Sequence, residues 1–121
     1  MKTISEALVP YRAYLLERKQ RLKEEIVSLE QQNRRDEANF AKVRLNIYEV
    51  FETVAAADEK AAADWPAFCA RYEPRFDTLT APWKSRLASA VQNSDTHTRF
   101  IEETKLSTAE HIRRAFLDTR E

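Results

Sequence analysis

The sequence predicts an all-α protein, and three observations support this fold class. No glycine occurs in the 121 residues, although average usage would supply about eight. Because glycine is the usual residue of positive-φ turns and of loops that cradle phosphates, its absence argues against β-rich folds and Gly-rich nucleotide sites. The chain is instead rich in Ala, Glu, Arg, Lys and Leu, which form helices well. Apolar residues also recur at helical spacing. We therefore predict one helical bundle domain over residues 1–121.

A seven-residue apolar repeat runs through the first sixty residues. One position of the repeat holds Leu8, Leu15, Leu22, Leu29, Asp36, Val43, Val50 and Ala57. A second position is apolar at Ile26 and again at Phe40, Ile47 and Val54. Polar residues interrupt the repeat between 31 and 36. The pattern fits two structures, an αα-hairpin that turns within 31–36 and a single helix from about residue 5 to 61.

The turn has sequence support of its own. Asn33 is the best replacement for glycine at a left-handed C-cap position, and Asp36 is a suitable N-cap for a second helix. The preserved register favours one long helix, but helices beyond 25 residues are uncommon in globular domains. We favour the hairpin and expect Leu22, Ile26 and Leu29 to face Phe40, Val43 and Ile47. We also expect Phe40, Ile47, Val50 and Val54 to form one buried face.

Prolines divide the second half of the chain into short helices. Asp64 can cap a helix whose first turn holds Pro66. Pro74 and Pro82 then predict pieces at 65–73, 75–80 and 82–93, with Thr80 as the cap of the last piece. A polar break at 93–95 precedes a final helix over about 95–118. Its apolar side holds Ile101, Thr108, Ile112 and Phe116. Because Ser107-x-x-Glu110 resembles a capping box, this last helix is also compatible with two helices.

The aromatic residues of the second half form a candidate interaction face. Trp65, Phe68, Tyr72, Phe76 and Trp83 fall on one helical face within 19 residues. Such a face could line a small-ligand cleft or accept a partner helix. The favoured interpretation is that these side chains cover the core of the hairpin, since aromatic residues dominate burial in small domains.

Positive charge gives a second candidate surface in the first hairpin. A basic face could be assembled from Arg12, Lys19, Lys23, Arg34 and Arg35, with Arg44 nearby. However, 20 basic residues balance 20 acidic ones, and each half of the chain is balanced separately. Nucleic-acid binders usually carry a basic excess, because neutralising phosphates supplies much of their affinity. We therefore expect a solvated mixed-charge face and consider nucleic acid an unlikely partner.

Residues with catalytic or metal-binding chemistry are sparse and scattered. His97 and His111 lie about 21 Å apart on a continuous helix and match no metal-ligand spacing. Cys69 lies among apolar neighbours, which favours a buried, inert thiol. A single cysteine fits a reducing compartment. The first residues do not resemble a signal peptide, and no segment predicts a membrane span. We expect no catalytic residue, metal or cofactor, and a cytoplasmic location.

The function that these observations favour is contact between helices of two proteins. We expect a small non-enzymatic protein that binds a protein partner or itself, with a homodimer as one form of that contact. The main alternative is a nucleic-acid-associated regulator that uses the basic face between Arg12 and Arg44. A small-ligand binder built on an aromatic cleft is the third and least favoured function. The sequence identifies no specific role for any of the three.

Overall fold

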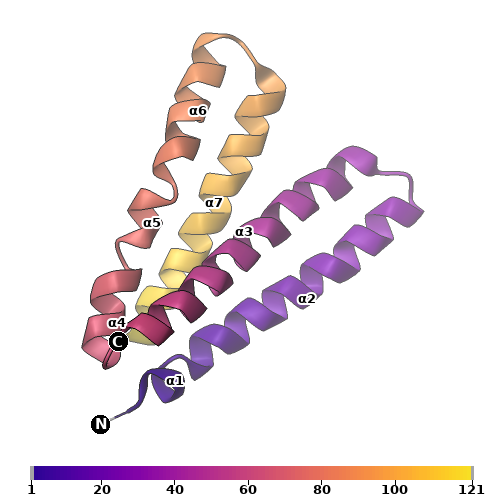
Figure 1. Cartoon of the computed structure of the whole chain (residues 1–121). Helices are drawn as coiled ribbons and strands as arrows, with labels where there is room; N and C mark the ends of the chain where they lie inside the picture. Colours follow the sequence, from indigo (N-terminus) through magenta and orange to yellow (C-terminus); the bar gives the residue numbers. More distant parts are fainter. Residues whose placement is uncertain (1, 121) are drawn as a thin grey trace.

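The computed structural model describes residues 2–120, and these form seven α-helices with no strand among them. The helices are α1 (Ile4–Ala7), α2 (Val9–Gln31), α3 (Arg35–Ala61), α4 (Trp65–Tyr72), α5 (Arg75–Thr78), α6 (Ala81–Gln92) and α7 (Thr96–Arg120). The pairs α2–α3 and α6–α7 form two helical arms. The arms meet at a base that holds both termini and diverge toward two tips (Figure 1). The all-helical prediction is confirmed.

The first arm turns at Asn33, as the hairpin prediction requires. Asn33 has a φ of 57°. The Arg34 amide donates to the Leu29 carbonyl over 2.9 Å, and the Asn33 amide donates to the Glu30 carbonyl over 3.1 Å. These two bonds define a Schellman motif. The chain is therefore a hairpin, and the alternative of one helix over residues 5–61 is wrong.

The cap of the second hairpin helix differs from the prediction. Arg34, not Asp36, is the N-cap residue of α3, and its side chain makes no capping bond. The Schellman turn ends directly after Asn33, so the helix begins at Arg35, one residue before Asp36. Asp36 lies instead in the first turn, where its negative charge favours the positive end of the helix dipole.

The second arm closes with the same motif as the first. Ser94 has a φ of 56°. The Asp95 amide donates to the Ala90 carbonyl over 2.8 Å, and the Ser94 amide donates to the Val91 carbonyl over 3.3 Å. The Asp95 carboxylate then accepts hydrogen bonds from the hydroxyl and amide of Thr98 at the start of α7. These two bonds hold the pKa of Asp95 below its ordinary value.

The proline-broken helices follow the prediction closely, with one different cap. Asp64 caps α4 by accepting a 2.9 Å hydrogen bond from the Ala67 amide. The N-cap position of α6 belongs to Thr80, but its hydroxyl donates back to the Phe76 carbonyl over 2.7 Å. Thr80 has helical dihedrals, so its side chain faces the preceding turn instead of the free amides of α6.

The final helix is continuous, so the capping-box signal at Ser107 and Glu110 is wrong. Helix α7 runs unbroken from Thr96 to Arg120. It carries buried side chains on both sides of Ser107, among them Glu102 and Ile112. Packing along its whole length outweighs the local signal, because tertiary contacts override weak capping preferences.

Helix α3 lies between α2 and α7 (Figure 1) and packs with one face against α2. Three polar pairs mark this face, namely Tyr14 with Tyr48, Lys19 with Glu52 and Arg12 with Glu59. Helical spacing places the buried Ala41 and Ala55 on the same side. Small side chains allow α2 and α3 to approach closely.

Part of the predicted packing of the apolar stripe of α3 differs in the structure. Ile47 is 1% exposed as expected, whereas Phe40, Val50 and Val54 are only half-buried. Phe40 and Val43 line a hollow together with residues of α7. The expected pairing of this stripe with Leu22, Ile26 and Leu29 is therefore wrong at Phe40 and Val43. A seven-residue period identifies an apolar face, but it does not identify the neighbour which that face meets.

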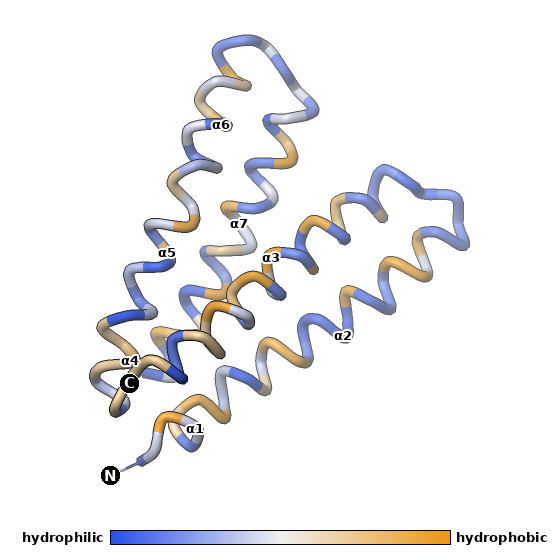
Figure 2. The backbone as a smooth tube through the Cα atoms, viewed as in Figure 1, coloured by the Kyte–Doolittle hydropathy of each residue, from blue (hydrophilic) through white to orange (hydrophobic). Residues whose placement is uncertain are grey.

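Aromatic residues concentrate at the base. The Phe116 ring of α7 lies with its centroid 5.4 Å from that of Tyr11, 5.0 Å from that of Tyr72 and 6.3 Å from that of Phe68. All four side chains are fully buried. The two turns at the tips are hydrophilic by contrast (Figure 2). The base therefore joins α2, α4 and α7 through one apolar cluster.

Polar groups inside the base have partners. The Tyr72 hydroxyl donates to the Phe51 carbonyl, and the Tyr11 and Tyr72 hydroxyls lie 2.5 Å apart. Burial raises the pKa of both phenols well above the ordinary value. The buried Asp58 carboxylate of α3 accepts two hydrogen bonds from Arg75 of α5. These contacts satisfy the polar atoms that the packing removes from water.

We expect Ile47→Ala to lower the free energy of unfolding by about 2–5 kcal/mol, because truncating a buried Ile leaves a cavity. Urea denaturation followed by circular dichroism measures this loss. Val91→Ala is the control: Val91 is 54% exposed, and surface substitutions stay within about 0.5 kcal/mol. An equally small effect at Ile47 would contradict the described core.

We expect Ser94→Gly to raise the free energy of unfolding by about 0.5–1 kcal/mol, since a left-handed conformation costs a non-glycine residue about 1–2 kcal/mol. The control is Ser85→Gly in the exposed interior of α6. It should lower stability by about 0.5 kcal/mol through helix propensity. Denaturation of both variants checks the pair, and a loss of stability at Ser94 would count against the Schellman turn.

Candidate functional site in the cleft between the arms

The predicted aromatic face lies mostly inside the molecule. Phe68, Tyr72 and Phe76 are buried in the base. Trp65 and Trp83 are half-buried and pack against the same cluster. The Trp65 and Phe68 rings are stacked with their centroids 5.6 Å apart. In this arrangement only the two tryptophans offer surface to another molecule.

The predicted basic face is largely neutralised within the chain. Arg12 pairs with Glu59, Lys19 pairs with Glu52 and Arg34 pairs with Glu37. The Lys19 side chain retains only 14% of its exposure. Lys23 and Arg35 are exposed. Because paired cations are shielded by their acids, this surface presents much less positive potential than its five basic residues suggest.

The histidines and the cysteine are separate from one another. His97 lies at the start of α7 and lines a hollow between the arms, whereas His111 is exposed two-thirds along the same helix. Cys69 is buried in α4, and this burial raises the pKa of its thiol. Within residues 2–120, no group of three or more His, Cys, Asp or Glu side chains is placed to hold a metal ion.

A concave surface lies between the first turns of α3 and α7. It has a volume of about 440 Å³. Its walls are mainly apolar, and it is lined by Asp36, Asn39, Phe40, Val43, His97, Phe100 and Ile101. We call this hollow and its continuation along α7 the inter-arm cleft. Its lining residues belong to α3 of the first arm and α7 of the second.

The cleft continues past two phenylalanines. A second hollow of about 350 Å³ is lined by Arg44, Glu103, Thr104 and Ser107, and it shares Phe40 and Phe100 with the first. Phe40 is half-buried, and Phe100 is 50% exposed. An aromatic ring this exposed in a concave, apolar setting is typical of a binding surface.

Polar side chains stand at both ends of the cleft. Asp36, Asn39 and His97 lie at the end near the tips, and Arg44 and Glu103 lie in the second hollow. Glu103 also pairs with Arg99 one turn earlier on α7. This arrangement is suited to holding an apolar group between the two rings while polar groups fix its direction.

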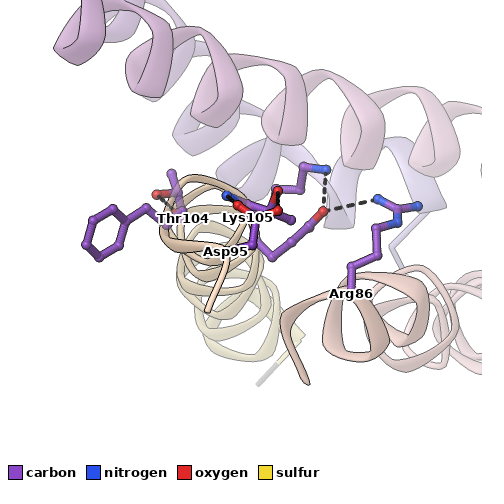
Figure 3. A network of polar contacts seen from close by, with 7 residues as sticks. Arg86, Asp95, Thr104 and Lys105 are labelled. Carbon is purple, nitrogen blue, oxygen red and sulfur yellow. Dashed lines mark hydrogen bonds and ion pairs between the residues drawn. The ribbon is translucent and has the colours of Figure 1, made fainter. Parts of the chain in front are cut away.

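A buried carboxylate orders the C-terminal arm behind the cleft. Glu102 of α7 is 3% exposed. Its Oε1 atom lies 3.2 Å from Arg86 of α6 and 3.2 Å from Lys105 (Figure 3). Lys105 also lies over the Trp83 ring, 6.0 Å from its centroid. The Oε2 atom is buried without a hydrogen-bond partner. This network joins α6 to α7 and fixes the helix that carries Phe100.

The sequence analysis placed Ile101 on the apolar side of the last helix and Phe40 on a buried face, but it predicted no cleft and did not single out Phe100. The sequence does contain a signal for Phe100, because this residue lies off the apolar side of its helix. That side includes Ile112 and Phe116. An exposed aromatic residue points to a binding surface where it is part of a larger apolar patch. The pairing of Phe100 with Phe40 depends on the angle between the arms, which no local pattern encodes.

Comparison with known proteins gives no relative. No protein-family model matches the chain, and neither the curated proteins nor the solved structures contain a significant match. Among residues 2–120, no helix combines the length and apolar character needed to cross a bilayer.

We expect the chain to bind DNA and RNA weakly, with an affinity poorer than about 1 µM at physiological salt, because intrachain acids neutralise the basic face. Elution from a heparin column and fluorescence anisotropy with a labelled duplex measure this. Glu52→Gln with Glu59→Gln would free Lys19 and Arg12 and should move elution to higher salt. Salt-sensitive sub-micromolar binding by the unmodified chain, lost on Arg12→Glu and Lys23→Glu, would contradict the expectation.

Proposed function

We propose that this protein is a non-enzymatic binding protein that receives an amphipathic helix of a partner protein in the inter-arm cleft. The observation that carries the proposal is the half-exposed Phe100, which shares an apolar hollow with Phe40 of the other arm. Leaving a phenylalanine in water forfeits about 1.5–3 kcal/mol that burial would provide. Because Phe100 is 50% exposed, a partner that covers the ring recovers about half of this free energy.

The shape of the cleft favours a helix over a compact ligand. Both walls are helices, and the second hollow extends the groove along α7 from Phe100 to Ser107. Phe100, Thr104 and Ser107 follow the three- and four-residue spacing of one helix face. A partner helix can lay residues of the same spacing against that strip, which is the helix-in-groove mode of recognition.

Two other functions compete with this proposal. A small apolar ligand would fit a hollow of about 440 Å³, a volume within the usual range of ligand pockets. A nucleic-acid regulator would need the basic face, whose Arg12, Lys19 and Arg34 already have acidic partners. We place the protein in the cytoplasm, since a single buried thiol suits a reducing compartment.

A displayed library of helical peptides tests the proposal. We expect selection on the folded protein to enrich peptides with apolar residues at i, i+3, i+4 and i+7. The affinity of the selected peptides should fall at least about tenfold for Phe100→Glu, because a charge would then face the apolar part of the peptide. Titration by fluorescence anisotropy measures the change.

Val91→Glu is the matched control. Val91 is exposed to nearly the same degree as Phe100, 54% against 50%, and it lies on α6 outside the cleft. Peptide affinity should be the same in this variant and in the unmodified chain. Peptides that bind the Phe100→Glu variant equally well, or a selection that enriches no helical pattern, would refute the proposed site.

A further inference from the structure

Helix α2 carries a second apolar seam on its outer side. The large hydrophobic side chains that are most exposed in the described chain are Val9, Leu16, Val27, Val91 and Phe100. Three of these five belong to α2, with exposed fractions of 61% at Val9, 64% at Leu16 and 54% at Val27. Since 7 and 11 residues separate them, these three side chains project from one face of the helix.

The seam has the spacing of a coiled-coil interface. Positions 9, 13, 16, 20, 23 and 27 alternate steps of four and three residues, and they hold Val9, Ala13, Leu16, Gln20, Lys23 and Val27. All six are exposed. They lie about 120° around the helix from the buried face at Leu15. We call these six residues the outer seam of α2.

We propose that a second copy of this chain packs on the outer seam, with the two α2 helices parallel. Charged residues along the seam favour this occupant and this direction. Glu17 and Glu24 flank the seam on one side, and Arg12 and Lys19 flank it on the other. In a parallel pair, each basic residue meets the acid five positions later on the other chain. Arg12 then faces Glu17 of the second copy, and Lys19 faces Glu24 of the second copy.

An antiparallel pair would place like charges together. Its centre falls near residue 18, so Glu17 would approach its own counterpart, and Lys19 would do the same. Arg12 and Lys19 already contact Glu59 and Glu52 of their own chain. In the parallel pair each cation therefore bridges two carboxylates, one from each chain. Gln20 and Lys23 within the seam weaken the pair, so we expect a reversible dimer that dissociates at about micromolar concentration.

The outer seam and the inter-arm cleft are independent surfaces. Helix α3 lies between α2 and α7, and the cleft is lined by α3 and α7 only (Figure 1). A dimer through α2 therefore leaves Phe40 and Phe100 open. Failure of one proposal leaves the other standing.

Light scattering across a concentration series tests the dimer. We expect the mass to rise from that of one 14.2 kDa chain toward twice that value between about 1 and 100 µM. Leu16→Glu and, separately, Val27→Glu should each keep the protein at the mass of one chain, with an unchanged helical circular dichroism spectrum. Val91→Glu should dimerise like the unmodified protein. A chain that stays monomeric at 100 µM, or a Leu16→Glu variant that dimerises normally, would overturn the proposal.

Disulfide trapping tests the direction of the pair. In a Cys69→Ala background, Val9→Cys and Val27→Cys each place a single thiol near one end of the seam. A parallel dimer brings identical positions together, so each variant should form a covalent dimer on its own under mild oxidation. An antiparallel dimer would be trapped only when the two variants are mixed, and that result would overturn the assigned direction. Val91→Cys, off the seam, should form little covalent dimer.

Discussion

The fold depends on the aromatic cluster at its base. Phe116 lies at the centre of it, within ring-contact distance of Tyr11, Phe68, Tyr72 and Phe76. Aromatic side chains bury more apolar area than any others, so a cluster of this size can join three segments far apart in the chain. Beyond the base, each arm is held together mainly by the contact between its own two helices. They consequently pack as pairs of helices, and the two pairs are free to diverge.

The absence of glycine decided which turns could be predicted from the sequence. With no glycine to mark turns, Asn33 was the recognisable substitute, and it adopts the left-handed conformation. Ser94 fills the same role in the other arm, but serine carries little preference for that conformation, so only the polar break was predictable. Asp64 was predicted as a cap from its place before Pro66, and its side chain accepts a hydrogen bond from the Ala67 amide. Local turn and capping preferences of this kind are therefore present in the structure as predicted.

Relations between distant segments were less predictable for a physical reason. The repeat through Phe40, Val43 and Ile47 showed that α3 has an apolar side. In the structure, however, α3 packs against two helices, α2 and α7. Ala41 and Ala55 lie on the side of α3 that meets α2, whereas Phe40 and Val43 line a hollow with α7. The aromatic set from Trp65 to Trp83 was expected to cover the core, and three of its members are buried there. The candidate cleft could not be foreseen, because its walls meet only through the angle between the arms.

Because the arms diverge from the base, a rotation of a helix at the base is enlarged at the tip of its arm. Helix α7 has 25 residues, a length of about 37 Å. A turn of roughly 5° at its buried end therefore displaces its far end by about 3 Å, which is comparable to the thickness of an aromatic ring. Small repacking around Phe116 would be magnified at Phe100. The width of the cleft between the arms would thus respond to side chains that lie outside the cleft.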